Sequence, residues 1–284
     1  PANSQPMPFC WREAEEQDSN RRMAFRRIER ISKEGKTEHI HSKLMILETQ
    51  VLMLNFCMLA YEYGNSVAPK AFKEIGIDPK YRFHEHISDT VTDTHMIILE
   101  CDDRIVVAFR GTTSTANVMT DLKAHSTKLA WALSVDEKLD KEIANDNLEA
   151  LEHAIDMTPE VVQRTLNVIQ NYEPELLRSD KRARVHFGFA QAYRSISQRM
   201  LFAVIALYQA KKRRIYMTGH SLGGALATLA SYHLSTVLKL ENPEEIVCVT
   251  CGSPRVGNAF FADLYNRTVP NSWRLVVSGD PVPK

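Results

Sequence analysis

One passage determines how this chain of 284 residues folds: Arg214-Ile-Tyr-Met-Thr-Gly-His-Ser-Leu-Gly-Gly-Ala-Leu-Ala-Thr-Leu-Ala230. It begins with a short β-rich run and turns at Gly219-His-Ser-Leu-Gly223, after which small and apolar residues predict a helix. A strand, Gly-x-Ser-x-Gly and a helix in this order are typical of the nucleophile elbow of serine hydrolases. The flanking glycines lack the Cβ atoms that would collide across the strained turn, which lifts the Ser221 hydroxyl clear of the sheet. A merely tight turn between strand and helix is the alternative interpretation.

The bulk composition limits the class of protein. Lysine plus arginine and aspartate plus glutamate are balanced at 35 each, so no chain-wide basic field favours nucleic acid as a partner. With 44% hydrophobic residues, the chain is long enough for one large α/β domain and some appendages. Its most apolar run, Leu44–Ala60, is interrupted by Glu48, Gln50 and Asn55. We therefore expect a helix buried in a soluble core and no membrane span.

The five cysteines are scattered and odd in number, which argues against a disulfide framework. This pattern favours an intracellular location, either cytoplasmic or at a membrane surface. Cys248-x-x-Cys251 has redox or half-zinc spacing, but no matching pair occurs elsewhere, so we interpret both as ordinary buried cysteines. The chain starts at Pro1 without methionine or a signal peptide, which indicates that it is processed or excerpted. We expect no metal and no cofactor.

A charged extension is predicted over residues 1–41, before a main domain over residues 42–284. Within the extension, arginines interleave with apolar residues in a pattern typical of a basic amphipathic helix. The pattern consists of Arg21, Arg22, Arg26, Arg27 and Arg30 with Met23, Phe25, Ile28 and Ile31. Such a helix can lie on an anionic membrane surface or dock on its own domain, and we prefer the second interpretation.

Strands and helices alternate along the main domain, which predicts a largely parallel sheet covered on both faces. The first expected elements are a helix over Ser42–Tyr63, a short helix near Pro69–Ile75 within otherwise looped residues 65–93, and strands over Met96–Cys101 and Ile105–Phe109. Further along the chain, a strand over Val185–Phe189 leads into a helix to Lys212, and the elbow follows. The last expected elements are a strand over Ile246–Thr250 followed by a helix, and a strand over Arg274–Val277.

Residues from about 125 to 181 predict a helical, acidic insertion. Asp136–Glu160 carries nine acidic residues against Lys138 and Lys141. Apolar residues recur at the spacing of two amphipathic helices, the second of them after Thr158-Pro159. The segment is too long for a simple connection. Three roles for this segment stay open: an enlarged lid, a regulatory cover, or an addition that packs to the side of the domain.

Further landmarks accompany the elbow in a characteristic order. They are Phe109-Arg-Gly-Thr112, Val185-His-Phe-Gly-Phe189, Gly252-Ser-Pro-Arg-Val-Gly-Asn258 and Asp280-Pro-Val-Pro283. Together they resemble the class 3 (fungal-type) triacylglycerol lipases, over about residues 42–284 apart from the acidic insertion. The resemblance implies an α/β-hydrolase fold and a serine ester hydrolase that cleaves acyl esters of lipids through an acyl-enzyme intermediate. It also implies a lipid or other acyl ester as the partner, with contact at a membrane surface.

The resemblance implies a role for each matching residue. Ser221 corresponds to the nucleophile, and Asp280 to the acid that orients the catalytic histidine; a turn aspartate before proline is the alternative for Asp280. The amides of Thr112 and Leu222 correspond to the oxyanion hole, where loss of one donor lowers the rate by about 10²–10³. Asp121 lies at the family's spacing for a residue that holds the Thr112 hydroxyl.

Residues Thr113–Asp121, including Asn117 and Val118, correspond to the family's lid over an apolar acyl groove. Val118 stands where these lipases usually carry tryptophan, which weakens the case for interfacial activation. His186 and His220 match positions that are not catalytic in the family, so we interpret both as structural.

The triad base is absent from its expected place. In hydrolases of this fold the order is Ser, Asp, His, yet all ten histidines precede Asp280. Either the sequence ends before the histidine-bearing region, or the protein has a lipase fold without lipase chemistry. The second case would be a non-catalytic interaction or regulatory protein, similar to the lipase-like scaffolds of plant immunity. The intact set of Ser221, Asp280 and Thr112 favours the enzyme.

Overall fold

The computed structural model describes the backbone of residues 29–31 and 37–39, and most of the side chains as well in residues 47–64, 72–112, 126–133, 158–172 and 182–283. The chain divides into two units, Pro1–Met45 and Ile46–Lys284. In the first unit, β1 (Glu29–Ile31) pairs antiparallel with β2 (Thr37–His39). The predicted basic helix is therefore wrong for β1, where backbone pairing outweighs the helical spacing of the side chains. The rest of that helix lies outside the described residues.

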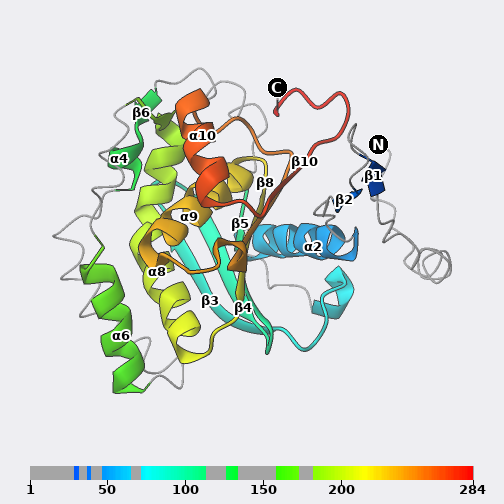
Figure 1. Cartoon of the computed structure of the whole chain (residues 1–284). Helices are drawn as coiled ribbons and strands as arrows, with labels where there is room; N and C mark the ends of the chain where they lie inside the picture. The colour runs from blue at the N-terminus through cyan, green and yellow to red at the C-terminus, as the bar shows by residue number, and fades with distance from the viewer. Residues whose placement is uncertain are drawn as a thin grey trace. The chain divides into compact units, whose positions relative to one another are not determined.

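A six-stranded sheet forms the centre of the second unit (Figure 1). In spatial order its strands are β10 (Ser272–Leu275), β9 (Ile246–Cys251), β8 (Arg214–His220), β5 (Arg104–Phe109), β4 (Thr94–Glu100) and β3 (Arg82–Asp89). β5, β8, β9 and β10 run parallel, and β4 is antiparallel to both β5 and β3. The largely parallel sheet predicted from the sequence is thus confirmed, with one antiparallel strand inside it.

The inner strands are continuous apolar runs, which is typical of strands covered on both faces. Every residue of β9 is buried, and in β8 the buried run extends from Ile215 to Gly219. The strands predicted near Met96–Cys101 and Ile105–Phe109 are β4 and β5. The last strand, β10, begins and ends two residues earlier than predicted.

β3 corrects the prediction of loops over residues 65–93. Its sequence is polar, and Ile87 is the one buried residue of this strand. An edge strand with a partly exposed face lacks the apolar run by which strands are recognised, and a bulge between Phe83 and Glu85 interrupts its alternation further. The short helix η1 (Phe72–Ile75) lies where the sequence predicted it.

Helices cover both faces of the sheet (Figure 1). α2 (Leu47–Gly64) packs on one face, and α8 (Phe187–Ala210) and α9 (Leu222–Leu238) pack on the other. α6 (Pro159–Gln170) packs against α8, and α10 (Ala259–Thr268) contacts α9. The end of α2 and both ends of α9 agree with the sequence prediction. Within the described ranges, no helix has the length and apolarity that crossing a membrane requires.

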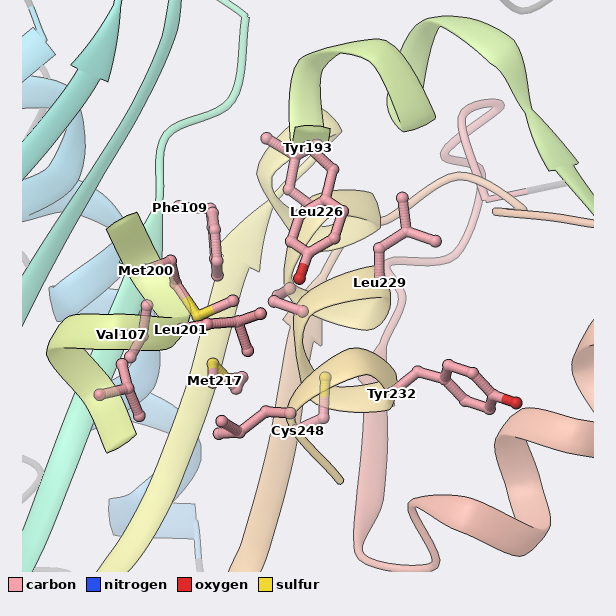
Figure 2. Close-up of a cluster of buried hydrophobic side chains, with 14 of the residues drawn as sticks. Val107, Phe109, Tyr193, Met200, Leu201, Met217, Leu226, Leu229, Tyr232 and Cys248 are labelled. Atoms are coloured by element: carbon pink, nitrogen blue, oxygen red, sulfur yellow. The ribbon is translucent and has the colours of Figure 1, made fainter. Parts of the chain in front are cut away.

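The main hydrophobic core lies between the sheet and the layer of α8 and α9 (Figure 2). Phe109 from β5 and Met217 from β8 belong to one cluster with Met200 and Leu201 from α8 and Leu226 from α9, and at most 2% of each residue is exposed. Burial of one such side chain stabilises the fold by about 1.5–3 kcal/mol. This core holds β8 against α9 and so fixes the two elements that flank Ser221.

The region of the predicted insertion is only partly helical where it is described. β6 (Ser126–Lys128) pairs antiparallel with β7 (Arg184–His186), so the prediction of helix from His125 onward is wrong at β6. Three residues are too few to show a period of two, which is why the sequence did not indicate this strand. α4 (Leu129–Ala132) follows it, and α6 begins after Thr158 as predicted. Most of the acidic stretch lies outside the described residues.

His233 of α9 is a buried polar residue between helices. Its Nδ1 lies 2.9 Å from the hydroxyl of Tyr193 on α8, and the ring of Tyr172 lies 5.5 Å from its own, centroid to centroid. Because this environment excludes water, burial lowers the pKa of His233 to about 3. The neutral imidazole is therefore the form that the core accommodates.

We predict that His233 makes the fold sensitive to acid. Its folded pKa lies below the ordinary value of 6.5, so its contribution is complete above pH 6.5 and is lost as the pH falls toward about 3. The loss reaches about 2 kcal/mol by about pH 5, since each pH unit in this window removes about 1.4 kcal/mol. Urea unfolding of the chain and of His233→Gln, each near neutral pH and near pH 5, checks this. The variant should lose less stability on acidification, and an equal loss in both proteins contradicts the assignment.

Candidate active site

Ser221 lies at the sharp turn between β8 and α9. Its backbone has φ 55° and ψ −123°, a conformation that L-residues rarely adopt, and its amide donates to the carbonyl of Cys251 at 3.0 Å. A Cβ atom at Gly219 would overlap the carbonyl group of Gly223, and one at Gly223 would overlap the carbonyl oxygen of Phe109. Strand, turn and helix thus pack backbone to backbone. This confirms the steric reason, predicted from the sequence, why both positions require glycine.

The Ser221 side chain remains available for chemistry. It is half-buried and, in the part of the chain that the structure describes, makes no capping hydrogen bond to α9. The first amides of α9, beginning with Leu222, have no acceptor within the helix and carry its positive end. Negative charge that develops beside Ser221 is therefore favoured.

Asp280 follows β10 and reaches the edge of the sheet at which β8 ends. Its amide donates to the carbonyl of Val277 at 3.2 Å, and its Oδ1 accepts from the amide of Val282 at 3.0 Å. Its Oδ2 faces Gly252, the residue after β9. A Cβ atom there would lie 3.3 Å from this oxygen and 3.6 Å from Nε2 of His220. Gly252 has φ +57°, so the turn needs glycine for its backbone as well as for space.

His220 is held between Tyr61 of α2 and Asp280. The hydroxyl of Tyr61 lies 3.0 Å from Nδ1 of His220. Burial raises the pKa of Tyr61 to about 12, so the hydroxyl stays protonated near neutral pH and can either donate to or accept from Nδ1. Burial also lowers the pKa of His220, and the Asp280 carboxylate opposes this effect.

Tyr61 also packs on the segment after β5. A Cβ atom at Gly111 would overlap the Tyr61 hydroxyl and lie 2.6 Å from the carbonyl oxygen of His220. Glycine at this position therefore lets α2, β5 and β8 approach one another. Sequence reasoning missed Tyr61, because it precedes His220 by 159 residues and nothing in its local sequence marks it.

Arg110 anchors the same segment from the direction of β4. It is only 4% exposed, and its Nη2 lies 2.7 Å from Oδ1 of Asp93 and 2.8 Å from the carbonyl oxygen of Asp93. Its amide donates to the carbonyl of His95 at 2.9 Å. The hydrogen bond from Arg110 lowers the pKa of Asp93, so the carboxylate stays charged. This pair, which sequence reasoning also missed, fixes the backbone that leads to Thr112.

The described site residues gather at one edge because parallel strands end there in register. The residues that follow these strand ends are Thr112 after β5, Ser221 and Leu222 after β8, and Asp280 after β10. The predicted lid and oxyanion-support residues Thr113, Asn117, Val118 and Asp121 lie outside the described residues. Among the side chains that are described, no group of three or more His, Cys, Asp and Glu could hold a metal ion.

Comparison with known proteins places this geometry in a family. The family model described as lipase (class 3) matches residues 106–284. A lipase of Caenorhabditis elegans is 44% identical over 79 residues, and secreted mono- and diacylglycerol lipase 1 of Fusarium solani is 39% identical over 101 residues. These matches cover 28% and 35% of this chain. They span only 22% and 29% of the two relatives.

Solved structures share the architecture. The crystal structure of a lipase from Rhizopus microsporus var. chinensis matches with a TM-score of 0.59 and 25% identity, covering 84% of this chain and 69% of that one. A mono- and diacylglycerol lipase from Aspergillus oryzae matches with a TM-score of 0.57 and 22% identity, covering 85% and 74% of the two chains. The expected α/β-hydrolase fold is confirmed. Since the family model matches more than half of its residues, the chain belongs to the class 3 lipase family.

Proposed function

We propose that this chain carries the nucleophile, the oxyanion hole and the acid of a serine ester hydrolase that cleaves acyl esters of lipids. The observation that carries the proposal is the strained backbone of Ser221, with Asp280 at the same edge of the sheet. A serine held in a costly conformation, with its hydroxyl not used for capping, favours a nucleophile over a structural residue. Membership of the class 3 lipase family supports the same reaction class.

In the proposed reaction, Oγ of Ser221 attacks the ester carbonyl carbon while a base removes its proton. The carbonyl oxygen becomes an oxyanion, which accepts hydrogen bonds from the amides of Thr112 and Leu222. Collapse of the tetrahedral intermediate expels the alcohol, which takes the proton from the base, and leaves the acyl group on Ser221. Water then attacks the acyl-enzyme by the same route and releases the fatty acid.

The base in this proposal is a histidine that is not among the ten of this sequence. All ten precede Asp280, whereas the order in this fold is Ser, Asp, His. His220 lies near Asp280, but its Nδ1 is already hydrogen-bonded with the Tyr61 hydroxyl and burial lowers its pKa. The Asp280 carboxylate is thus left to orient another imidazole.

Exposed apolar side chains next to Asp280 support a lipid as the substrate. Val276 is 50% exposed and Val277 is 76% exposed, in the segment between β10 and Asp280. Apolar surface at the rim of a candidate site favours contact with a lipid aggregate, because burying it there removes it from water. We propose that this rim touches the surface from which the substrate is taken.

The chain of 284 residues is predicted to hydrolyse p-nitrophenyl butyrate very slowly and to be accelerated by added imidazole. Loss of the triad histidine lowers kcat by about 10⁶-fold, because an unassisted serine hydroxyl is a poor nucleophile. Free imidazole can enter beside Asp280 and act as the base. Rates with and without imidazole are compared for the chain, for Ser221→Ala and for the matched control Ser126→Ala, whose serine is exposed on β6. The acceleration should vanish only in Ser221→Ala.

Two outcomes contradict the imidazole prediction in different ways. Rapid turnover without imidazole that Ser221→Ala abolishes means that one of the ten histidines is the base. If imidazole has no effect, and a longer form with a histidine after Asp280 cleaves no ester of any chain length, the non-catalytic interaction protein is the better reading.

Tyr61→Phe is predicted to lower the imidazole-assisted kcat about 10-fold with little change in KM. The variant removes the hydrogen bond to His220, which is worth about 0.5–1.5 kcal/mol, and the groups that it positions act on the transition state rather than on substrate binding. Tyr63→Phe is the matched control, because Tyr63 contacts Phe83 through its stacked ring. Steady-state kinetics of both variants check this. A change in KM alone, or equal losses in both variants, argues against a positioning role for Tyr61.

A further inference from the structure

A cavity of about 530 Å³ lies between α9, α10 and the strands β9 and β10. Its lining comes from the Gly252-Ser-Pro-Arg-Val-Gly-Asn258 segment, from α10 and from the side chains of β9 and β10. Neither Ser221 nor Asp280 lines it, nor do the proposed oxyanion donors. The volume lies in the range of sites that hold small molecules. The cavity is therefore a candidate site distinct from the nucleophile.

The inner wall of this cavity is apolar and rigid. Val256 and Phe261 line it and also belong to the main hydrophobic core, with 8% and 3% of their surfaces exposed. Tyr265 of α10 adds an aromatic ring that is buried as well. Because these side chains are fixed by the fold, an apolar ligand would meet a wall that is already formed.

Two arginines bring positive charge to the same cavity. Arg255 and Arg274 both line it and are both exposed. Over the described residues, no ion pair joins either guanidinium to a carboxylate. Burial lowers the pKa of Arg274, and the charge of Arg255 lowers it further. Two neighbouring cations without an acidic partner favour an anion between them.

Arg274 is held in place before any ligand arrives. Its Nη2 donates to the carbonyl oxygens of Ser253 at 2.6 Å and of Pro283 at 2.8 Å. Among the described residues, none accepts a hydrogen bond from its Nε or Nη1. A guanidinium that is already oriented loses little side-chain entropy when it binds a planar, two-oxygen acceptor such as a carboxylate.

We propose that this cavity binds a fatty-acid anion, with its carboxylate on Arg255 and Arg274 and its chain against Val256, Phe261 and Tyr265. The charge at the arginines matches the carboxylate, and the apolar wall matches the chain. A free inorganic anion would leave the apolar wall in contact with water. The inference does not require catalysis by Ser221, although a fatty acid is also the product class of the proposed reaction.

Calorimetric titration of the whole chain tests the proposal. Dodecanoate, kept below its micellar concentration, is titrated into the protein, and its binding should be saturable. The methyl ester of the same acid should bind at least about 10-fold more weakly, because it loses the charge-assisted hydrogen bonds.

Variants of Arg255 separate the charge from the fold. Arg255→Gln should weaken binding of the acid about 10-fold or more, Arg255→Lys should retain most of it, and the matched control Arg214→Gln, an exposed arginine at the start of β8, should leave it unchanged. Thermal unfolding and circular dichroism establish that each variant is folded. If Arg255→Gln does not fold, the Arg255→Lys protein and the comparison of acid with methyl ester decide the question.

Several results would overturn the proposal. They are the absence of saturable binding, equal affinity for the acid and its methyl ester, and equal weakening by Arg255→Gln and Arg214→Gln. Ser221→Ala distinguishes this site from the proposed active site. Unchanged binding in that variant supports a separate cavity, whereas its loss places the acid at the nucleophile. An inactive esterase that still binds the acid refutes the proposed function and leaves the cavity proposal intact.

Discussion

The close approach of three backbones around Ser221 is the constraint on which the rest of the structure depends. β5, β8 and the first turn of α9 meet where Gly219 and Gly223 leave no space for a side chain. The strained conformation of Ser221 carries a free-energy penalty of about 1–3 kcal/mol, which the fold tolerates only because its surroundings leave no relaxed alternative. The core behind the elbow supplies that rigidity, since α9 is packed against the sheet through fully buried side chains.

The parallel arrangement of the strands explains how distant residues join the same site. β5, β8, β9 and β10 all end at one edge, and the segments that follow them therefore converge. Open α/β sheets place ligand sites at the carboxyl ends of their strands for this reason. The helix on the opposite face contributes as well, because Tyr61 of α2 reaches across to His220 and Gly111. The candidate site is thus assembled from both helical layers as well as from the sheet.

What could be predicted from the sequence follows from the range of the interactions. The elbow, its strand and its helix lie within 25 residues, so the local sequence pattern is enough to predict their geometry. β8 and α9 accordingly have nearly the predicted bounds. β3 was not predicted, because a polar edge strand owes its existence to the neighbour that it pairs with. The contacts of Tyr61 with His220 and of Arg110 with Asp93 join separate elements, and no local residue pattern signals such pairs.

The two hydrogen bonds of Arg274 have a consequence for Asp280. One guanidinium nitrogen ties the carbonyl of Pro283 to that of Ser253, while the amide of Gly252 ties the carbonyl of Leu275 at the other end. The acid therefore lies in a short loop that is closed at both ends, and its conformational freedom is largely removed at the folding step. In the proposed reaction, an imidazole that reaches Asp280 would meet a preorganised acceptor and would not have to order it.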